Sequence, residues 1–181
     1  SWFQEEENKE VKEHLLADLF LLAEKHQYAG AYTLIASLQE SIKEQRVYMQ
    51  KAAESGSSAG MVAHGLFLCI THHTSVGFQW IQQGAEAGHE MGMFMTGLSY
   101  HFGTFTPIDY EQAAQWYKMV IEKYNNYYAA INLGVLYADA GCFHSAKKYF
   151  TLADSVKDKI MEDIENFGLR DTLTNLNTCF R

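Results

Sequence analysis

The chain has 181 residues, one proline, a hydrophobic fraction of 48% and a formal net charge of -8. This acidic balance argues against nucleic acid as a partner, because neutralising phosphates requires clustered lysine and arginine. No stretch approaches the roughly 18 consecutive apolar residues of a membrane-spanning helix. The single proline, together with abundant Ala, Leu, Glu and Gln, favours an all-α protein.

The first segment of the chain is rich in glutamate, which predicts a solvated helix. Residues 19–27 read LFLLAEKHQ and match the pattern of the second helices described below, so we expect an N-terminal half-repeat over residues 9–27. Because the chain opens on Ser1, we expect a processed or trimmed N-terminus, with any targeting signal lost from view.

After this segment, a pattern of small and aromatic residues recurs four times. The aromatics stand at residues 48, 80, 116 and 149, so they are 32, 36 and 33 residues apart. A period of about 34 residues suits two helices of three to four turns joined by short turns. The small residues in register are Ala36, Gly65, Gly97 and Gly134, and the aromatics are Tyr48, Trp80, Trp116 and Tyr149.

The recurrence predicts a stack of helical hairpins. A small residue lets the aromatic side of a neighbouring helix approach closely, and the aromatic fills the layer between hairpins. A single hairpin cannot bury its apolar face alone, so neighbours must stack. We expect one repeat domain over residues 1–181, with repeats at about 28–56, 57–88, 89–124 and 125–157 and C-terminal capping helices over 158–181.

These motifs resemble the Sel-1-like repeat family, a branch of the tetratricopeptide-type solenoids, over about residues 19–157. The segment GLSYHFGTFTPIDYEQAAQWYK (97–118) fits the family pattern best. Two units depart from it, because Ala36 replaces the glycine in the first and residues 143–150 lack the Asp-Tyr pair in the fourth. The resemblance implies a right-handed α-α superhelix. It also implies the role of a bacterial-type adaptor that binds proteins, for which we expect no cofactor.

Two turns carry helix-capping signals. The only proline, Pro107, precedes Asp109, which we expect to cap the next helix with Gln112 at the capping-box position. The segment GSSAG (56–60) matches the nucleophile motif G-x-S-x-G, but a helix precedes it rather than the strand that this motif requires. We therefore expect Gly56 to end a helix and Ser57 or Ser58 to cap the next, and we predict no catalytic residue.

Histidines and cysteines suggest no metal site. His72 and His73 are neighbours on a helix and point apart, and Met93 stands where a zinc motif beginning at His89 needs its second histidine. Three cysteines are too few for a disulfide framework, which favours a cytoplasmic location, while a periplasmic or secreted one stays open. A bridge between Cys142 and Cys179 also stays open.

Residues 57–107 are the most unusual stretch, because Glu86 and Glu90 are their only charged residues. In solenoids of this kind the first helix of each hairpin lines the concave face, so an apolar strip is expected there. Leaving such a strip in water is costly, which indicates that something covers it. The predicted partner-binding residues are Val62, Leu66, Met91, Phe94, Leu98, His101, Phe102, Tyr128, Ile131 and Val135.

The C-terminal segment offers one possible cover. Apolar residues keep helical spacing there after the repeat pattern fades. We expect this tail to cap the last hairpin or to fold back into the groove, and an exposed groove that awaits a partner is the alternative. The residues concerned are Ile160, Ile164, Phe167, Leu169, Leu173, Leu176 and Phe180.

The sequence thus favours a scaffold or adaptor that binds a partner protein, and the acidic balance suits a basic partner. We expect a monomer or a weak dimer. An immunity or inhibitor protein that neutralises a toxin stays open as an alternative. A hydrolase has less support, because no paired acids, catalytic triad or ligand cluster stands at a workable spacing.

Overall fold

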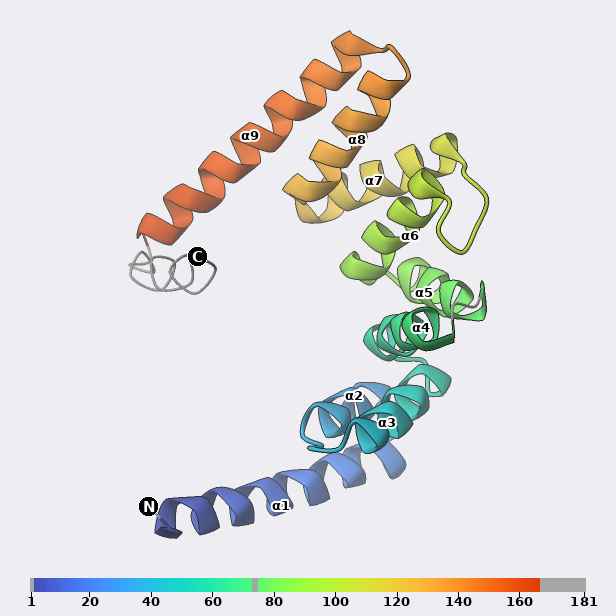
Figure 1. The fold of residues 1–181 in the computed structure, drawn as a ribbon. Coiled ribbons are helices and arrows are strands. Elements are labelled where there is room, and N and C mark those ends of the chain that lie inside the picture. Colours follow the sequence, from blue (N-terminus) through green and yellow to red (C-terminus); the bar gives the residue numbers. More distant parts are fainter. Residues whose placement is uncertain (1, 73–74, 167–181) are drawn as a thin grey trace. The chain divides into compact units, whose positions relative to one another are not determined.

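The computed structural model describes residues 2–72 and 75–166 and consists there of helices joined by short turns (Figure 1). The all-α class expected from composition and periodicity is confirmed for these residues. The helices are α1 (Trp2–Glu24), α2 (Ala29–Ser37), α3 (Ile42–Glu54), α4 (Ser58–His72), α5 (Ser75–Glu86), α6 (Glu90–Phe102), α7 (Tyr110–Tyr124), α8 (Tyr127–Asp139) and α9 (Phe143–Asn166).

The chain divides into two compact units, and the division falls inside α7. The first unit, residues 1–113, contains α1 to α6 and the first turn of α7. The second unit, residues 114–181, contains the rest of α7 together with α8 and α9.

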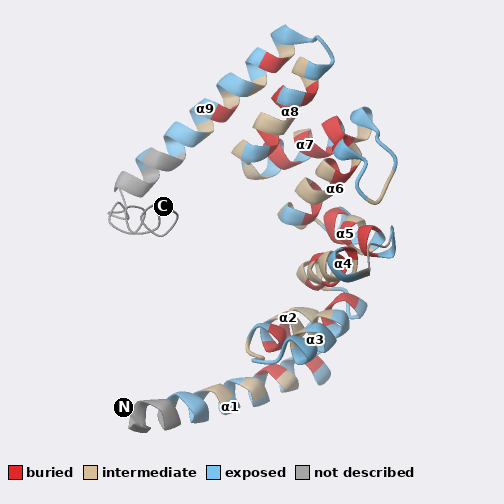
Figure 2. Ribbon diagram, viewed as in Figure 1, coloured by how far each residue is buried: buried red, intermediate tan, exposed pale blue. Residues whose placement is uncertain are grey.

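In the first unit, helices that follow one another in the chain pack side by side. The pairs α1 with α2, α2 with α3, α3 with α4, α4 with α5 and α5 with α6 are all in contact. Buried residues lie on the sides where helices meet, and exposed residues face outward (Figure 2). Near the N-terminus, Leu19 and Ala23 of α1 pack with Ala31 and Ile35 of α2 in one apolar cluster. Neighbouring helices therefore bury apolar residues against one another, as repeat architectures require.

Helices α4 and α5 approach each other closely in this unit. A Cβ built on Gly65 of α4 would stand 2.6 Å from the carbonyl oxygen of Gly77 in α5 and 2.8 Å from Cγ1 of Ile81. The small residue at position 65 thus admits the backbone of the neighbouring helix. The sequence predicted that the aromatic side of a neighbouring helix would approach here, and the structure instead places Gly77 and Ile81 at this position.

The turns confirm the capping signals. Gly56 has a φ of +94°, a conformation that favours glycine, and it follows the last residues of α3. The hydroxyl of Ser57 then accepts a hydrogen bond of 3.2 Å from the amide of Gly60 at the start of α4. Likewise, Asp109 Oδ1 accepts from the amide of Gln112 at 2.9 Å. The segment 56–60 is therefore a turn between hairpins, as expected, and its serine caps a helix.

In the second unit α8 packs against α9. A Cβ on Gly134 would lie 2.7 Å from the ring of Phe150, so here the small residue does admit an aromatic. The ring of Tyr149 stacks on that of Tyr137 with centroids 5.5 Å apart. Lys118 of α7 forms a hydrogen bond with Tyr137, and this bond raises the pKa of the lysine. The α8–α9 hairpin is thus held by aromatic contacts.

The first and last residues of each repeat stay a prediction. The ends of two helices differ from the predicted boundaries. Helix α1 begins at Trp2, before the expected start of the half-repeat at residue 9. Helix α9 continues without a break through residue 157 to Asn166, so the first part of the expected capping segment is a continuation of α9. Residues 167–181, and with them the expected tail residues Phe167 to Phe180 and Cys179, lie outside the described residues.

Candidate functional site

The first unit contains an apolar cleft that brings together three of the predicted partner-binding residues. Its volume is about 620 Å³, within the range of about 300 to 1,000 Å³ that binding pockets occupy. Residues of α4, α5 and α6 form its walls, and the loop after α6 completes them. The lining residues are Leu66, Cys69, Ile70, Ile81, Met95, Leu98, Ser99, Phe102, Thr104 and Phe105.

Two large side chains of the cleft are strongly exposed. Ile70 in the last turn of α4 is 72% exposed, and Phe102 at the end of α6 is 62% exposed. Leu66 and Leu98 are half-buried and lie deeper along the same two helices. Exposed apolar groups that border a cleft favour binding, because covering them releases ordered water.

The loop that closes the cleft has an unusual backbone. Phe105 adopts a φ of +67°, a left-handed conformation that is costly for residues with a Cβ. The amide of Thr104 donates to the carbonyl of Ser99 at 3.0 Å, and the amide of Asp109 donates to the carbonyl of Tyr100 at 2.9 Å. These two hydrogen bonds tie both ends of the loop to α6 and place Phe105 in the cleft wall.

Two of the predicted partner-binding residues are buried, contrary to expectation. Val62 is only 3% exposed, because its Cγ2 methyl group fills the space left by Gly84 of α5 and Gly92 of α6. His101 is 5% exposed, and its ring stacks on that of Phe102 with centroids 4.3 Å apart. Neither side chain presents a surface to a partner, although His101 supports the aromatic ring that does.

The other predicted residues lie outside this cleft. Met91 is exposed and Phe94 half-buried in the earlier part of α6. Tyr128, Ile131 and Val135 belong to α8 in the second unit. Tyr128 and Val135 are exposed there, and Ile131 is half-buried. The residues predicted as one strip are therefore spread over several surfaces.

Seven lining residues were absent from the predicted set: Cys69, Ile70, Ile81, Met95, Ser99, Thr104 and Phe105. Ile70 could have been predicted from helical spacing, since it lies four residues after Leu66 and therefore on the same face of the helix. For Phe105 no periodic signal exists, because the loop takes its position from backbone hydrogen bonds to α6.

The chemistry of the cleft is that of a binding surface. Among the residues that the structure describes, its lining contains no carboxylate, amine or imidazole. The titratable group of this described lining is the thiol of Cys69, and burial raises its pKa, which disfavours the reactive thiolate. The described lining thus supplies hydrophobic contact and two hydroxyl groups, but no acid–base pair.

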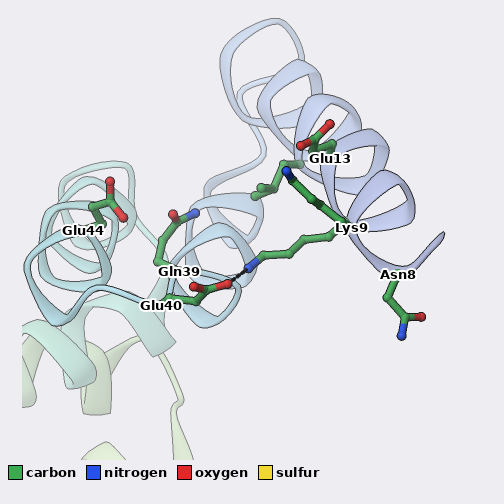
Figure 3. A pocket seen from close by; sticks show the side chains of 8 residues that line it. Asn8, Lys9, Glu13, Gln39, Glu40 and Glu44 are labelled. Atoms are coloured by element: carbon green, nitrogen blue, oxygen red, sulfur yellow. Dashed lines mark hydrogen bonds and ion pairs between the residues drawn. The ribbon is translucent and has the colours of Figure 1, made fainter. Parts of the chain in front are cut away.

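A second, polar pocket lies beside α1 and has a volume of about 590 Å³ (Figure 3). Lys12 crosses it to form an ion pair of 2.8 Å with Glu40, marked by the dashed line in Figure 3. The hydrogen bond from Lys12 holds the pKa of Glu40 below its ordinary value. Glu13 and Glu44 also line this pocket. Such exposed pairs contribute little to stability or binding, so this pocket is a solvated surface.

Among the described residues, no group of three or more His, Cys, Asp and Glu side chains is arranged to hold a metal ion. His89 has a structural role instead, because its Nδ1 accepts a hydrogen bond of 3.4 Å from the amide of Gly92 at the start of α6. Of the helices in the described part of the chain, none combines the length and apolar character that crossing a membrane requires.

A buried histidine lies on the other side of α4. His64 is 7% exposed, and its ring meets that of Trp80 edge to face with centroids 5.5 Å apart. Its Nδ1 has no hydrogen-bond partner among the described residues. Burial lowers the pKa of His64, with Arg46 acting in the same direction and Glu54 opposing it. This side chain is therefore held in its neutral form.

Stacked helical hairpins with short turns place the chain among the all-α repeat proteins. Comparison with solved structures gives the type of repeat: the fold is that of Sel1-like repeat proteins, as the sequence resemblance implied. No protein-family model matches the chain, and a search of curated proteins also gave no match.

Three solved structures illustrate the similarity. A Sel1 repeat protein from Oxalobacter formigenes is 21% identical with a TM-score of 0.57, and the match covers 71% of this chain and 57% of that one. The protective antigen c5321 of uropathogenic Escherichia coli strains, which displays an SLR fold, is 16% identical with a TM-score of 0.60. That match covers 77% of this chain and 35% of the antigen. MamA is 15% identical with a TM-score of 0.58, and the match covers 87% and 95% of the two chains.

Proposed function

We propose that this chain is a non-catalytic protein-binding module, a scaffold or adaptor that holds apolar side chains of a partner in the cleft between α4, α6 and the loop 103–109. The observation that carries the proposal is the exposure of Ile70 and Phe102 beside an uncharged cleft. Covering an aliphatic or aromatic side chain contributes about 1.5 to 3 kcal/mol, so two such anchors favour association substantially.

The fold supports the same function. The cleft is formed mainly by α4 and α6, each the first helix of its hairpin, and by the loop tied to α6. It therefore rests on helices that pack against their neighbours. A site that is already ordered before the partner binds loses little conformational entropy on binding, which favours association. The described residues of this lining supply apolar contact and hydroxyl groups rather than the acid–base groups that a hydrolase needs, which favours binding over catalysis.

Co-purification with two cleft variants and one control tests the proposal. Phe102→Gln and Ile70→Gln remove the exposed apolar groups without adding charge. Ile42→Gln makes the same kind of change at an exposed isoleucine of α3 that does not line the cleft. We expect both cleft variants to lose specific partners by about tenfold or more, as a loss of 1.4 kcal/mol implies, while the control retains them.

Circular dichroism on all three variants checks that the helical content is unchanged. Capture of the same proteins at the same level by wild type and by both cleft variants would contradict the assignment of the cleft as the binding surface. A loss that Ile42→Gln shares would also contradict it, because the effect would then not be specific to the cleft.

A further inference from the structure

The segment of sequence that supplies the cleft lining has charged side chains of one sign, while Arg46 of the neighbouring α3 lies 4.4 Å from the ring of Phe67 in α4. Between Lys51 and Lys118 the sequence contains no lysine or arginine, and every lining residue of the cleft lies in this stretch. The stretch does contain acidic side chains, so apart from its histidines all of its charged side chains are negative. These acidic residues are Glu54, Glu86, Glu90, Asp109 and Glu111.

Two of the acidic residues, Asp109 and Glu111, follow the loop whose residues 104 and 105 line the cleft. The hydrogen bond from the amide of Asp109 to the carbonyl of Tyr100 brings the end of the loop back to α6, whose residues 99 and 102 line the cleft. Asp109 and Glu111 are both exposed. Their carboxylates are therefore available to a bound segment that extends beyond the apolar lining.

The ends of two helices add to the negative potential. Ile70 lies in the last turn of α4, and Phe102 is the last residue of α6. The aligned peptide dipoles give the C-terminal end of a helix a partial negative charge, which favours a nearby cation. The ends of α4 and α6 at the cleft and the two carboxylates that follow the loop therefore have the same sign.

We propose that the cleft binds a cationic amphipathic segment, in which apolar anchor residues are flanked by lysine or arginine. This inference rests on the proposed function and specifies its partner. The apolar anchors fill the uncharged lining, and the flanking cations meet Asp109, Glu111 and the helix ends. A segment with acidic flanks meets repulsion at the same places, so charge sets the choice of partner and hydrophobic contact supplies the affinity.

Three fluorescein-labelled peptides of about 16 residues, long enough for a helix to form on binding, test this proposal. The first has leucines on one helical face and lysines elsewhere. In the second, glutamates replace the lysines. The third has the composition of the first with its leucines distributed around the helix. Fluorescence anisotropy with the full chain measures each affinity.

We expect the lysine peptide to bind about tenfold or more tightly than the glutamate peptide, and to weaken as salt rises from about 50 to about 500 mM because the charges are screened. The rearranged peptide should bind about tenfold more weakly, since it has lysines but no continuous apolar face. This last comparison separates the cleft from a general attraction of cations to an acidic protein.

Variants then locate the interaction. Phe102→Gln should weaken binding of the lysine peptide about tenfold through loss of an anchor contact. The double change Asp109→Asn and Glu111→Gln should weaken it by about threefold to tenfold, and the asparagine preserves the cap at the start of α7. Glu10→Gln, which removes an exposed charge from α1, serves as the matched control and should leave the affinity unchanged.

Equal affinity for the lysine and glutamate peptides would overturn the charge preference, and unaltered binding of the lysine peptide to the Phe102→Gln variant would overturn its location. Neither result affects the proposed function if co-purified partners still depend on Phe102 and Ile70. If those partners do not depend on the two residues, the proposed function fails together with this inference.

Discussion

The backbones of Gly65 in α4 and Gly77 in α5 lie in direct contact, so that a Cβ on either residue would stand 2.6 Å from the carbonyl oxygen of the other. Backbone atoms in two packed helices cannot move aside as a side-chain end can. The distance between α4 and α5 therefore depends on the absence of side chains at these two positions. Because α4 and α5 both supply walls of the cleft, the same contact positions Leu66 and Ile81.

Gly65→Ala is expected to destabilise the protein. The new methyl group would stand 2.6 Å from the Gly77 carbonyl oxygen and 2.9 Å from the Ile81 amide nitrogen, so the helices must separate. Overpacking of this kind costs about 1 to 3 kcal/mol. Urea denaturation followed by circular dichroism measures the loss. Gly30→Ala is the matched control, because the three atoms nearest its methyl group all belong to the side chain of Tyr28, which can rotate away. Equal stability of the two variants would contradict the conclusion that the contact between α4 and α5 requires glycine at position 65.

Ser57→Ala is expected to lower the free energy of unfolding by about 1 kcal/mol, whereas Ser58→Ala should change it by less than about 0.5 kcal/mol. The hydroxyl of Ser57 accepts from the Gly60 amide at 3.2 Å and also forms a hydrogen bond of 3.0 Å with the hydroxyl of Thr33. The same urea titrations compare the two variants. A larger loss for Ser58→Ala would show that the wrong serine has been identified as the cap.

The stability of the first unit should fall as the pH is lowered below about 6.5, because of His64. Burial places the pKa of this side chain in the folded protein below its ordinary value of 6.5. The unfolded chain therefore binds a proton at a higher pH than the folded chain, and unfolding is favoured as the pH falls from 6.5 towards the folded pKa. The slope contributed by one group is at most about 1.4 kcal/mol per pH unit.

His64→Phe removes the titrating group and keeps a ring beside Trp80. Denaturation at a series of pH values should show a shallower acid dependence for this variant than for wild type, while His144→Gln, at an exposed position, should follow wild type. Identical slopes for wild type and His64→Phe would count against a contribution from His64.

Alkylation should distinguish Cys69 from Cys142. Cys69 is buried and its pKa is raised by that burial, whereas Cys142 is exposed. At about pH 8 we expect iodoacetamide to modify Cys142 on the order of 100-fold faster than Cys69, because only the accessible thiolate reacts. Peptide mapping by mass spectrometry follows each site separately. Equal rates at the two cysteines would show that the cleft wall opens readily.

Local features of the fold could be predicted from the sequence. The caps at Ser57 and Asp109 and the turn at Gly56 depend on residues within four positions of one another, so the signals are contained in short segments. The close approach at Gly65 was expected, but its partner was not. The contact with Gly77 depends on the rotation of α5 about its axis, which the period of the repeat does not specify.

The candidate site was predicted less completely, for a related reason. Neighbouring residues on a helix differ by about 100° in direction, so a small error in rotation moves a residue from the surface to the interior. Val62 illustrates the point, because glycines of α5 and α6 leave space for its Cγ2 methyl group and the side chain faces inward. The loop carrying Phe105 follows no helical period, and only its hydrogen bonds to α6 bring it into the cleft.

The backbone of Phe105 gives the cleft an energetic property as well as a shape. A left-handed conformation at a residue with a side chain costs about 1 to 3 kcal/mol, which the two hydrogen bonds at the loop ends and the surrounding contacts must offset. Any ligand that packs against this ring adds contacts that favour the costly conformation. Occupancy of the cleft and the conformational equilibrium of the loop are therefore thermodynamically linked, and filling the cleft should make the loop more rigid.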